Sequence, residues 1–181
     1  DFLLRKSNLK TVIISSIVFI LFMSFVLPKV SSYTEEVTGS SKSPDTSLIY
    51  SSNDLFDIAD EYGEEGRDAY IYLRFTFDVV WPIVYFMFLV SLTGLLIKKL
   101  NLSEKYKYLI FISIFGVMFD FLENITSVIV MYKYPTEMLF FANLAPIMTL
   151  FKWSFIGISF ISIIVLSLIF LFKKVLKQNS I

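Results

Sequence analysis

Apolar side chains gather into four long runs along the chain, at residues 9–28, 71–97, 108–131 and 146–173. Each run is long enough to cross a hydrocarbon layer of about 30 Å when it rises about 1.5 Å per residue as an α-helix. The pattern therefore predicts an all-α membrane protein with a four-transmembrane-helix bundle. A chain of 181 residues has room for one such core, so we expect a single membrane domain over residues 1–181.

The first run follows Arg5, Lys6 and Lys10, which resemble the basic part of a secretory signal peptide. Its apolar stretch is longer than the roughly 7–15 residues of a signal peptide, and no small-residue cleavage pattern follows it. We therefore expect an uncleaved helix that ends at Pro28.

The fourth apolar stretch is too long for one straight span, because residues 136–172 would extend about 55 Å as a helix. Pro146 is the natural point of division, since proline ends or kinks a helix. We predict an interfacial or re-entrant piece over residues 136–145. The spanning helix then covers residues 146–173 and carries the proline in its first turn.

The segment between the first two runs, residues 29–70, is polar and acidic, and residues 31–52 look irregular. From about residue 53 to 65, apolar side chains recur at helical spacing, with acidic ones on the opposite face. These apolar residues are Leu55, Ile58, Ala59 and Tyr62. We predict an extracytoplasmic amphipathic helix across the mouth of the bundle, with a solvated acidic loop as the alternative.

Charge is unevenly distributed, although the chain carries 16 basic and 16 acidic residues. Ten acidic residues face only two basic ones between positions 31 and 69. Basic residues collect before the first run, between the second and third, and after the fourth. Because such residues mark the cytoplasmic side, we expect a multi-pass protein of the plasma (inner) membrane with both termini in the cytoplasm.

Composition excludes several kinds of chemistry. The chain is 56% hydrophobic, with a mean hydropathy of +0.70, and contains neither cysteine nor histidine. Disulfides, thiolate or histidine metal sites and a Ser-His-Asp triad are therefore impossible. We expect membrane lipids as partners, with another membrane protein or a second copy of this chain as alternatives, and no nucleic acid.

Charged and amide side chains interrupt three of the four runs. Arg74 and Asp78 lie four residues apart in the second run, and Lys152 lies in the fourth. The third run carries one polar stripe at helical spacing, made of Asp120, Glu123, Asn124 and Ser127. Counted from the outer end of each helix, five of these residues lie about 9–16 Å deep: Asp78, Asp120, Glu123, Asn124 and Lys152. The sequence therefore predicts one cluster in the outer half of the bilayer.

Charges at membrane depth must find partners, because an isolated one costs about 2.5–3.5 kcal/mol on insertion scales. We expect Arg74 to pair with Asp78, and Lys152 to pair with Glu123 or Asp120. One carboxylate is left over, and a proton, a cation or a cationic ligand group is expected to neutralise it.

We therefore predict a ligand-binding site composed of Arg74, Asp78, Trp81, Tyr85, Asp120, Glu123, Asn124 and Lys152. Trp81 and Tyr85 either line this site or belong to the interfacial aromatic belt. The expected occupant is a polar or lipid-like ligand, or a membrane partner. The alternative is a purely structural role, in which these groups only hold the helices together.

Two chemical alternatives remain open. One is an enzyme that acts on a lipid-type substrate, with Asp120 and Glu123 as the candidate acid and base. The other is a small proton- or cation-coupled carrier. We expect no resident metal or cofactor, and a divalent cation at Asp78, Asp120, Glu123 and Asn124 is a further alternative.

Three short motifs in the middle of the chain share a pattern with known sequences: Tyr62-Gly63-x-x-Gly66-Arg67-x-x-Tyr70, Asp78-x-x-Trp81-Pro82-x-x-Tyr85 and Asp120-x-x-Glu123-Asn124. Together they resemble an uncharacterised bacterial family of four-helix integral membrane proteins. The resemblance covers roughly residues 50–155 and implies that these residues belong to one unit. It implies no activity and no cofactor.

Overall fold

The computed structural model describes residues 2–178, and every regular element in this range is helical. The elements are α1 (Phe2–Lys6), α2 (Leu9–Leu21), a π-helical turn (Phe22–Val26), α3 (Leu27–Thr38), a 3-10 turn (Pro44–Thr46), α4 (Ser52–Glu61), α5 (Gly63–Phe75), α6 (Phe77–Lys99), a second 3-10 turn (Glu104–Lys107), α7 (Tyr108–Lys133) and α8 (Leu139–Gln178). The predicted all-α class is confirmed.

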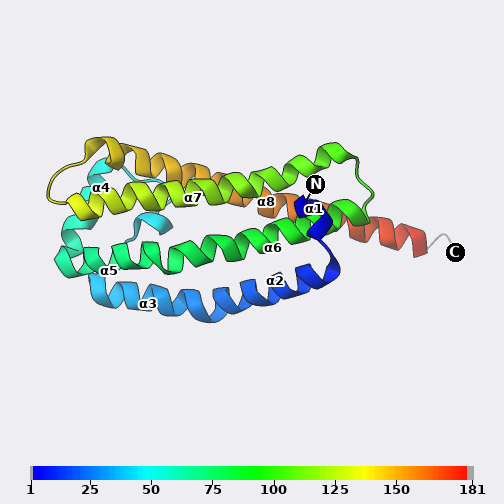
Figure 1. The fold of residues 1–181 in the computed structure, drawn as a ribbon, viewed down its shortest axis with the longest axis horizontal. Coiled ribbons are helices and arrows are strands. Elements are labelled where there is room, and N and C mark those ends of the chain that lie inside the picture. Colours follow the sequence, from blue (N-terminus) through cyan, green and yellow to red (C-terminus); the bar gives the residue numbers. More distant parts are fainter. Residues whose placement is uncertain (1, 179–181) are drawn as a thin grey trace.

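Four helical stretches are long and apolar enough to cross a membrane by length and composition: Leu9–Thr38, Gly63–Lys99, Glu104–Lys133 and Leu139–Leu176. They lie side by side along one long axis (Figure 1). These stretches confirm the predicted four-helix bundle and fit a multi-pass membrane protein.

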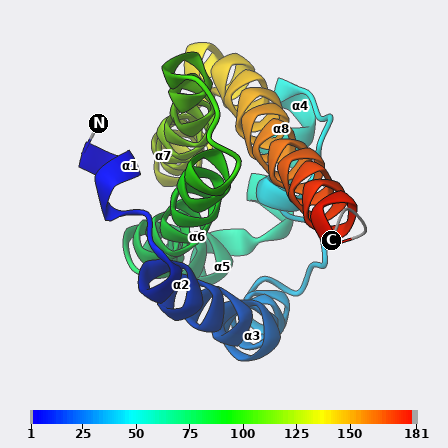
Figure 2. The same cartoon turned by 90° about the vertical axis from the view of Figure 1, so that its right-hand side faces the viewer.

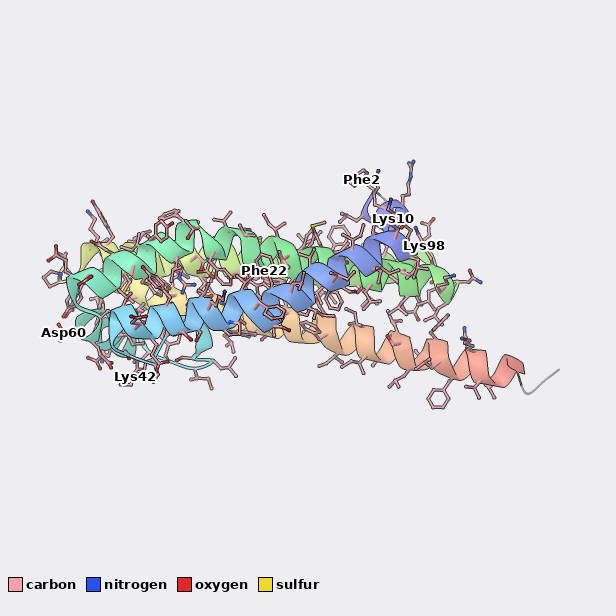
Figure 3. All side chains as sticks on the ribbon, turned by 90° about the horizontal axis from the view of Figure 1, so that it is seen from below. Phe2, Lys10, Phe22, Lys42, Asp60 and Lys98 are labelled. Carbon is pink, nitrogen blue, oxygen red and sulfur yellow. The ribbon has the colours of Figure 1, made fainter. Side chains whose placement is uncertain are left out.

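The two ends of the bundle differ in charge. Lys10 and Lys98 lie toward one end, and Lys42 and Asp60 lie toward the other (Figure 3). We call the end that carries α4 and Asp60 the acidic end, and the opposite end the basic end. The orientation of these ends relative to the cytoplasm stays a prediction.

The first long helix extends well beyond its predicted end at residue 28. The backbone stays helical through Pro28 and ends at Gly39, whose φ of 65° is left-handed. Proline lacks an N–H and its ring crowds the preceding turn of an α-helix. The π-helical turn Phe22–Val26 directly before it widens the helix at this point, so the chain passes the proline without breaking.

Helix α4 occupies the position of the predicted amphipathic helix. Ser51 caps it by accepting a hydrogen bond from the Asp54 amide, and the carboxylate of Asp54 accepts one from the Ser51 amide. Its apolar face is buried against α7 and α8. The helix ends at Glu61, earlier than predicted, because Gly63 adopts a left-handed φ of 62° and turns the chain into α5.

The predicted division of the last apolar stretch at Pro146 is wrong. Helix α8 is continuous from Leu139, so residues 136–145 do not form a separate interfacial piece. The turns before the proline are held by packing, since Ala142 and Ala145 are fully buried in an apolar cluster with Leu55 of α4. This contact keeps the turns helical despite the hydrogen bond that proline cannot make.

Two separate apolar clusters fill the bundle. The cluster at the acidic end is formed by α4, α5, α7 and α8, and includes Leu55, Tyr70 and Val130. The cluster toward the basic end is formed by α6 and α8 and includes Leu89 and Ile163. The charged and amide side chains predicted to form one cluster lie between these two apolar clusters along the helices.

The first long helix stands to one side of the bundle. Helix α2 packs against α6, and α3 packs against α5, whereas α8 packs mainly against α7, α6 and α4. Viewed along the bundle axis, the chain that joins α3 to α4 turns inward between α5 and α8 (Figure 2). This joining chain, residues 39–51, is called the plug segment below.

Candidate functional site

Arg74 of α5 and Asp78 of α6 form the first part of the site, as predicted. Arg74 Nη1 lies 3.0 Å from Asp78 Oδ2, and it also donates a hydrogen bond of 3.3 Å to Asn124 Oδ1 of α7. The Asn124 amide donates in turn to the Asp78 carbonyl oxygen, at 3.4 Å. Asn124 therefore ties α7 to the point where α5 joins α6.

Lys152 of α8 and its partners form the second part of the site. Lys152 forms an ion pair with Glu123, and its Nζ atom lies 3.7 Å from Asp120 Oδ1. Glu123 is fully buried and also accepts a 2.9 Å hydrogen bond from the Thr149 hydroxyl. The Tyr85 hydroxyl donates to Asp120 Oδ2 at 2.7 Å. The predicted pairings of both cations are confirmed.

Asp45 is the member of the site that the sequence did not reveal. The 3-10 turn of the plug segment carries it into the bundle, where Arg74 binds both of its carboxylate oxygens in a fork. Nη1 donates to Oδ1 at 2.7 Å. Lys152 Nζ lies 3.7 Å from the same oxygen, and Ser43 donates to Oδ2 at 3.0 Å. The carboxylate of Asp45 thus bridges the two buried cations.

The six charged residues form one unit, which we call the charged layer: Asp45, Arg74, Asp78, Asp120, Glu123 and Lys152. It contains two cations and four carboxyl groups. Burial by itself raises the pKa of Asp45, but the positive charges of Arg74 and Lys152 and the Ser43 hydrogen bond outweigh it and hold that pKa below its ordinary value. Asp45 is therefore present as the anion.

Side chains of the helices hold the plug segment in place. The Trp153 indole of α8 donates to the Asp45 carbonyl oxygen at 3.1 Å, and the Tyr62 hydroxyl donates to the Lys42 carbonyl oxygen at 2.7 Å. The hydroxyls of Tyr50 and Thr149 lie 3.0 Å apart. Burial raises the pKa of the Tyr50 hydroxyl above its ordinary value, so Tyr50 takes part as the neutral phenol.

Four buried polar atoms in or near the charged layer have no hydrogen-bond partner among the described residues: the Tyr70 hydroxyl, Arg74 Nε, the Ser127 hydroxyl and Glu123 Oε2. Glu123 Oε2 is engaged by the Lys152 ion pair, which leaves the first three. The Tyr70 ring lies against the guanidinium, 4.2 Å from Arg74 Cζ. Tyr70 and Ser127 each lie one helical turn toward the acidic end, from Arg74 and Glu123 respectively. A buried donor without a partner costs about 1–3 kcal/mol, so these atoms are suited to contact a bound group.

Trp81 lies outside the charged layer and, unlike Tyr85 and Asn124, forms no hydrogen bond with it among the described residues. It stacks with Phe19 of α2 and with Phe77, at centroid distances of 5.6 and 6.3 Å. It reaches the layer through the edge of the Tyr85 ring, 5.7 Å away. The tryptophan that contacts the layer is Trp153, which the sequence placed beside Lys152.

No three acidic side chains within residues 2–178 are arranged to hold a metal ion. Asp78, Asp120 and Glu123 are instead engaged by Arg74, by Tyr85 and by Lys152. The divalent cation that the sequence allowed at these positions stays a prediction.

Comparison with known proteins finds no matching family model, no matching curated protein and no matching solved structure. This agrees with the resemblance drawn from the sequence, which carries no named family and no activity. Function is therefore inferred from the charged layer itself.

Proposed function

We propose that this membrane protein binds a ligand through an anionic group, a phosphate or a carboxylate, held by Arg74 and Lys152 in the position of Asp45. The ligand is a polar or lipid-like molecule or part of a membrane partner. The observation that supports this proposal is the origin of the Asp45 carboxylate: it comes from a connecting segment, while every other member of the layer comes from a spanning helix.

The donor geometry favours an anion. A guanidinium presents parallel N–H groups that match the two oxygens of a carboxylate or phosphate, and Arg74 uses them on Asp45. Lys152 adds a second positive charge 3.7 Å from one of these oxygens. Asp45 therefore acts as an internal substitute for the ligand, and the plug segment competes with it.

The surplus of carboxyl groups supports a second candidate, a proton-coupled carrier. Two cations face four carboxyls, and protons on two of the carboxyls are the smallest addition that balances the charges of a buried layer. A carrier also needs a path to the basic end, where the second apolar cluster fills the bundle. Ligand binding requires no such path, so it is the function that the layer supports best.

The test is mass spectrometry of small molecules and lipids that co-purify with the full chain. Asp45→Asn removes the internal competitor and is expected to raise the occupancy of an anionic molecule. Arg74→Gln and Lys152→Gln are expected to lose it. Lys42→Gln is the matched control, because Lys42 is exposed and its side chain pairs, among the described residues, only with Glu61 at the surface, at 3.5 Å.

The proposal fails if folded Arg74→Gln and Lys152→Gln proteins retain the same anionic molecules as the unsubstituted protein. It also fails if folded Asp45→Asn protein, whose substitution lies outside the α-helices, carries no more of them than Lys42→Gln does.

A further inference from the structure

We propose that the anionic group is the phosphate of a membrane lipid, which reaches the charged layer sideways between α3 and α8 when the plug segment moves out. This inference rests on the proposed function and adds the class of ligand and its route. Four features of the structure support it.

The first feature is the arrangement of the helices around the plug segment. Helix α3 packs against α5, and α8 packs against α7, α6 and α4, so the plug segment occupies the side of the bundle between them (Figure 2). Toward the basic end this side closes, where the rings of Phe19 and Phe160 come within 6.3 Å. Moving the plug segment therefore opens a lateral passage at the level of the charged layer.

The second feature is how the plug segment is attached. Irregular backbone at membrane depth persists only where protein buries it or where it lines a polar cavity. The carbonyl groups of Lys42 and Asp45 are satisfied by side chains from the surrounding helices, Tyr62 and Trp153. Releasing the segment breaks these few side-chain hydrogen bonds and ion pairs, and no helical ladder has to unwind.

The third feature is the apolar surface around the passage. Leu48 and Ile49 of the plug segment are exposed, at 57% and 91%, although their neighbour Tyr50 points inward to Thr149. On α8, Leu150 precedes Lys152 by two residues and is also exposed. A molecule that fits here carries its charge inward to Arg74 and Lys152 and its apolar chain outward along these residues.

The fourth feature distinguishes a phosphate from a carboxylate. Asp45 offers two oxygens, which Arg74 Nη1 and Nη2 occupy, while Arg74 Nε and the hydroxyl of Tyr70, whose ring lies against the guanidinium, have no hydrogen-bond partner among the described residues. A phosphate offers additional acceptor oxygens to such donors. A lipid phosphate can therefore accept hydrogen bonds from more donors around the charged layer than the Asp45 carboxylate does.

The experiment uses tryptophan fluorescence, because the chain has two tryptophans and Trp81→Phe leaves Trp153 as the reporter. The full-length Trp81→Phe protein is placed in phosphatidylcholine nanodiscs that contain a small fraction of brominated phosphatidic acid, or the same fraction of brominated phosphatidylcholine. Brominated chains quench an indole that they touch. We expect stronger quenching by phosphatidic acid, a larger preference with Asp45→Asn, and loss of the preference with Arg74→Gln.

The control keeps Trp81 and replaces the other tryptophan, as Trp153→Phe. Because Trp81 lies in the aromatic stack with Phe19, its quenching is expected to show no preference for phosphatidic acid. Brominated stearic acid tests the phosphate assignment: its carboxylate should quench Trp153 less than phosphatidic acid, and equal quenching overturns that assignment.

Inorganic phosphate added to the same nanodiscs separates the two proposals. If it shifts the Trp153 emission while the two brominated lipids quench equally, the layer binds anions and the lateral lipid route is wrong. If phosphate, phosphatidic acid and stearic acid all leave Trp153 unaffected in Asp45→Asn, both proposals are wrong. A preference that persists in folded Arg74→Gln also overturns the lipid inference.

Discussion

The guanidinium of Arg74 is shared among Asp45, Asp78 and Asn124, which come from three different parts of the chain. Such sharing is what makes a buried cation tolerable, because each partner offsets part of the loss of hydration. Removing the cation leaves the buried carboxylates without compensation. Removing Asp45 instead leaves Arg74 with two of its partners.

Arg74→Gln should therefore lower the free energy of unfolding by about 3–5 kcal/mol. Asp45→Asn should cost less, because the amide keeps an acceptor oxygen and Asp78 still neutralises Arg74. Reversible unfolding in mixed micelles measures both. Lys42→Gln, at an exposed pair, should change stability by less than about 1 kcal/mol, and an equal loss in Arg74→Gln and Lys42→Gln would contradict the buried network.

Docking of the plug segment should depend on pH through Asp45. Its pKa is lower when docked than its ordinary value of 3.8, so ionisation favours the docked state. The stabilisation is fully present above the ordinary pKa and is lost as pH falls through the lowered value. Limited proteolysis of residues 39–51 should therefore increase in acid below about pH 4, and Asp45→Asn should remove the Asp45-dependent part of this increase.

At the scale of helices, the sequence predicted which helices exist more accurately than the residues at which they begin and end. Apolar runs of sufficient length gave the four long helices, and the spacing of Leu55, Ile58 and Ala59 gave α4. Both prolines were misread for the same reason. Each would break an isolated helix, but a π-helical turn accommodates Pro28, and packing of α4 holds the turns before Pro146.

The helix residues of the charged layer were predictable because spacing and depth constrain them, and Arg74, Asp78, Asp120, Glu123 and Lys152 do come together. Asp45 was not predictable, because it lies in a polar stretch whose position depends on contacts with distant helices. The sequence indicated only that residues 31–52 are irregular, and an irregular stretch has no periodicity that shows which way a side chain points. An interfacial or re-entrant piece was expected at residues 136–145, whereas the segment that enters the bundle is residues 39–51.

Packing between α4 and α8 should be sensitive to volume at Ala142, which is fully buried. Ala142→Leu forces extra methylene groups into this contact and should cost about 1–3 kcal/mol of stability. Thermal unfolding of the purified protein measures it. Phe140→Leu is the control on the same helix, since Phe140 is exposed, and comparable destabilisation by both substitutions would argue against the α4 contact.

At the scale of the whole molecule, the charged layer separates two apolar clusters, and opposite charge marks the two ends of the bundle (Figure 3). Excess Lys and Arg at the basic end predicts that this end faces the cytoplasm. The structure supports this arrangement of ends, and the direction across the membrane is a prediction.

Single-cysteine labelling gives that direction, because the chain has no cysteine of its own. In intact cells, a membrane-impermeant maleimide should label Lys42→Cys, at the acidic end. It should label Lys105→Cys, in the turn between α6 and α7, only after the membrane is permeabilised. Both lysines are exposed, so the reverse pattern would contradict the predicted orientation.

The charged layer also has a consequence for biosynthesis. Its members are made in the order Asp45, Arg74, Asp78, Asp120, Glu123 and, last, Lys152. Until α8 has been synthesised, Glu123 and Asp120 sit in a membrane segment without the cation that pairs with them. We therefore expect α7 to remain with the insertion machinery until α8 emerges, so that the lipid bilayer accepts the third long helix only together with the fourth.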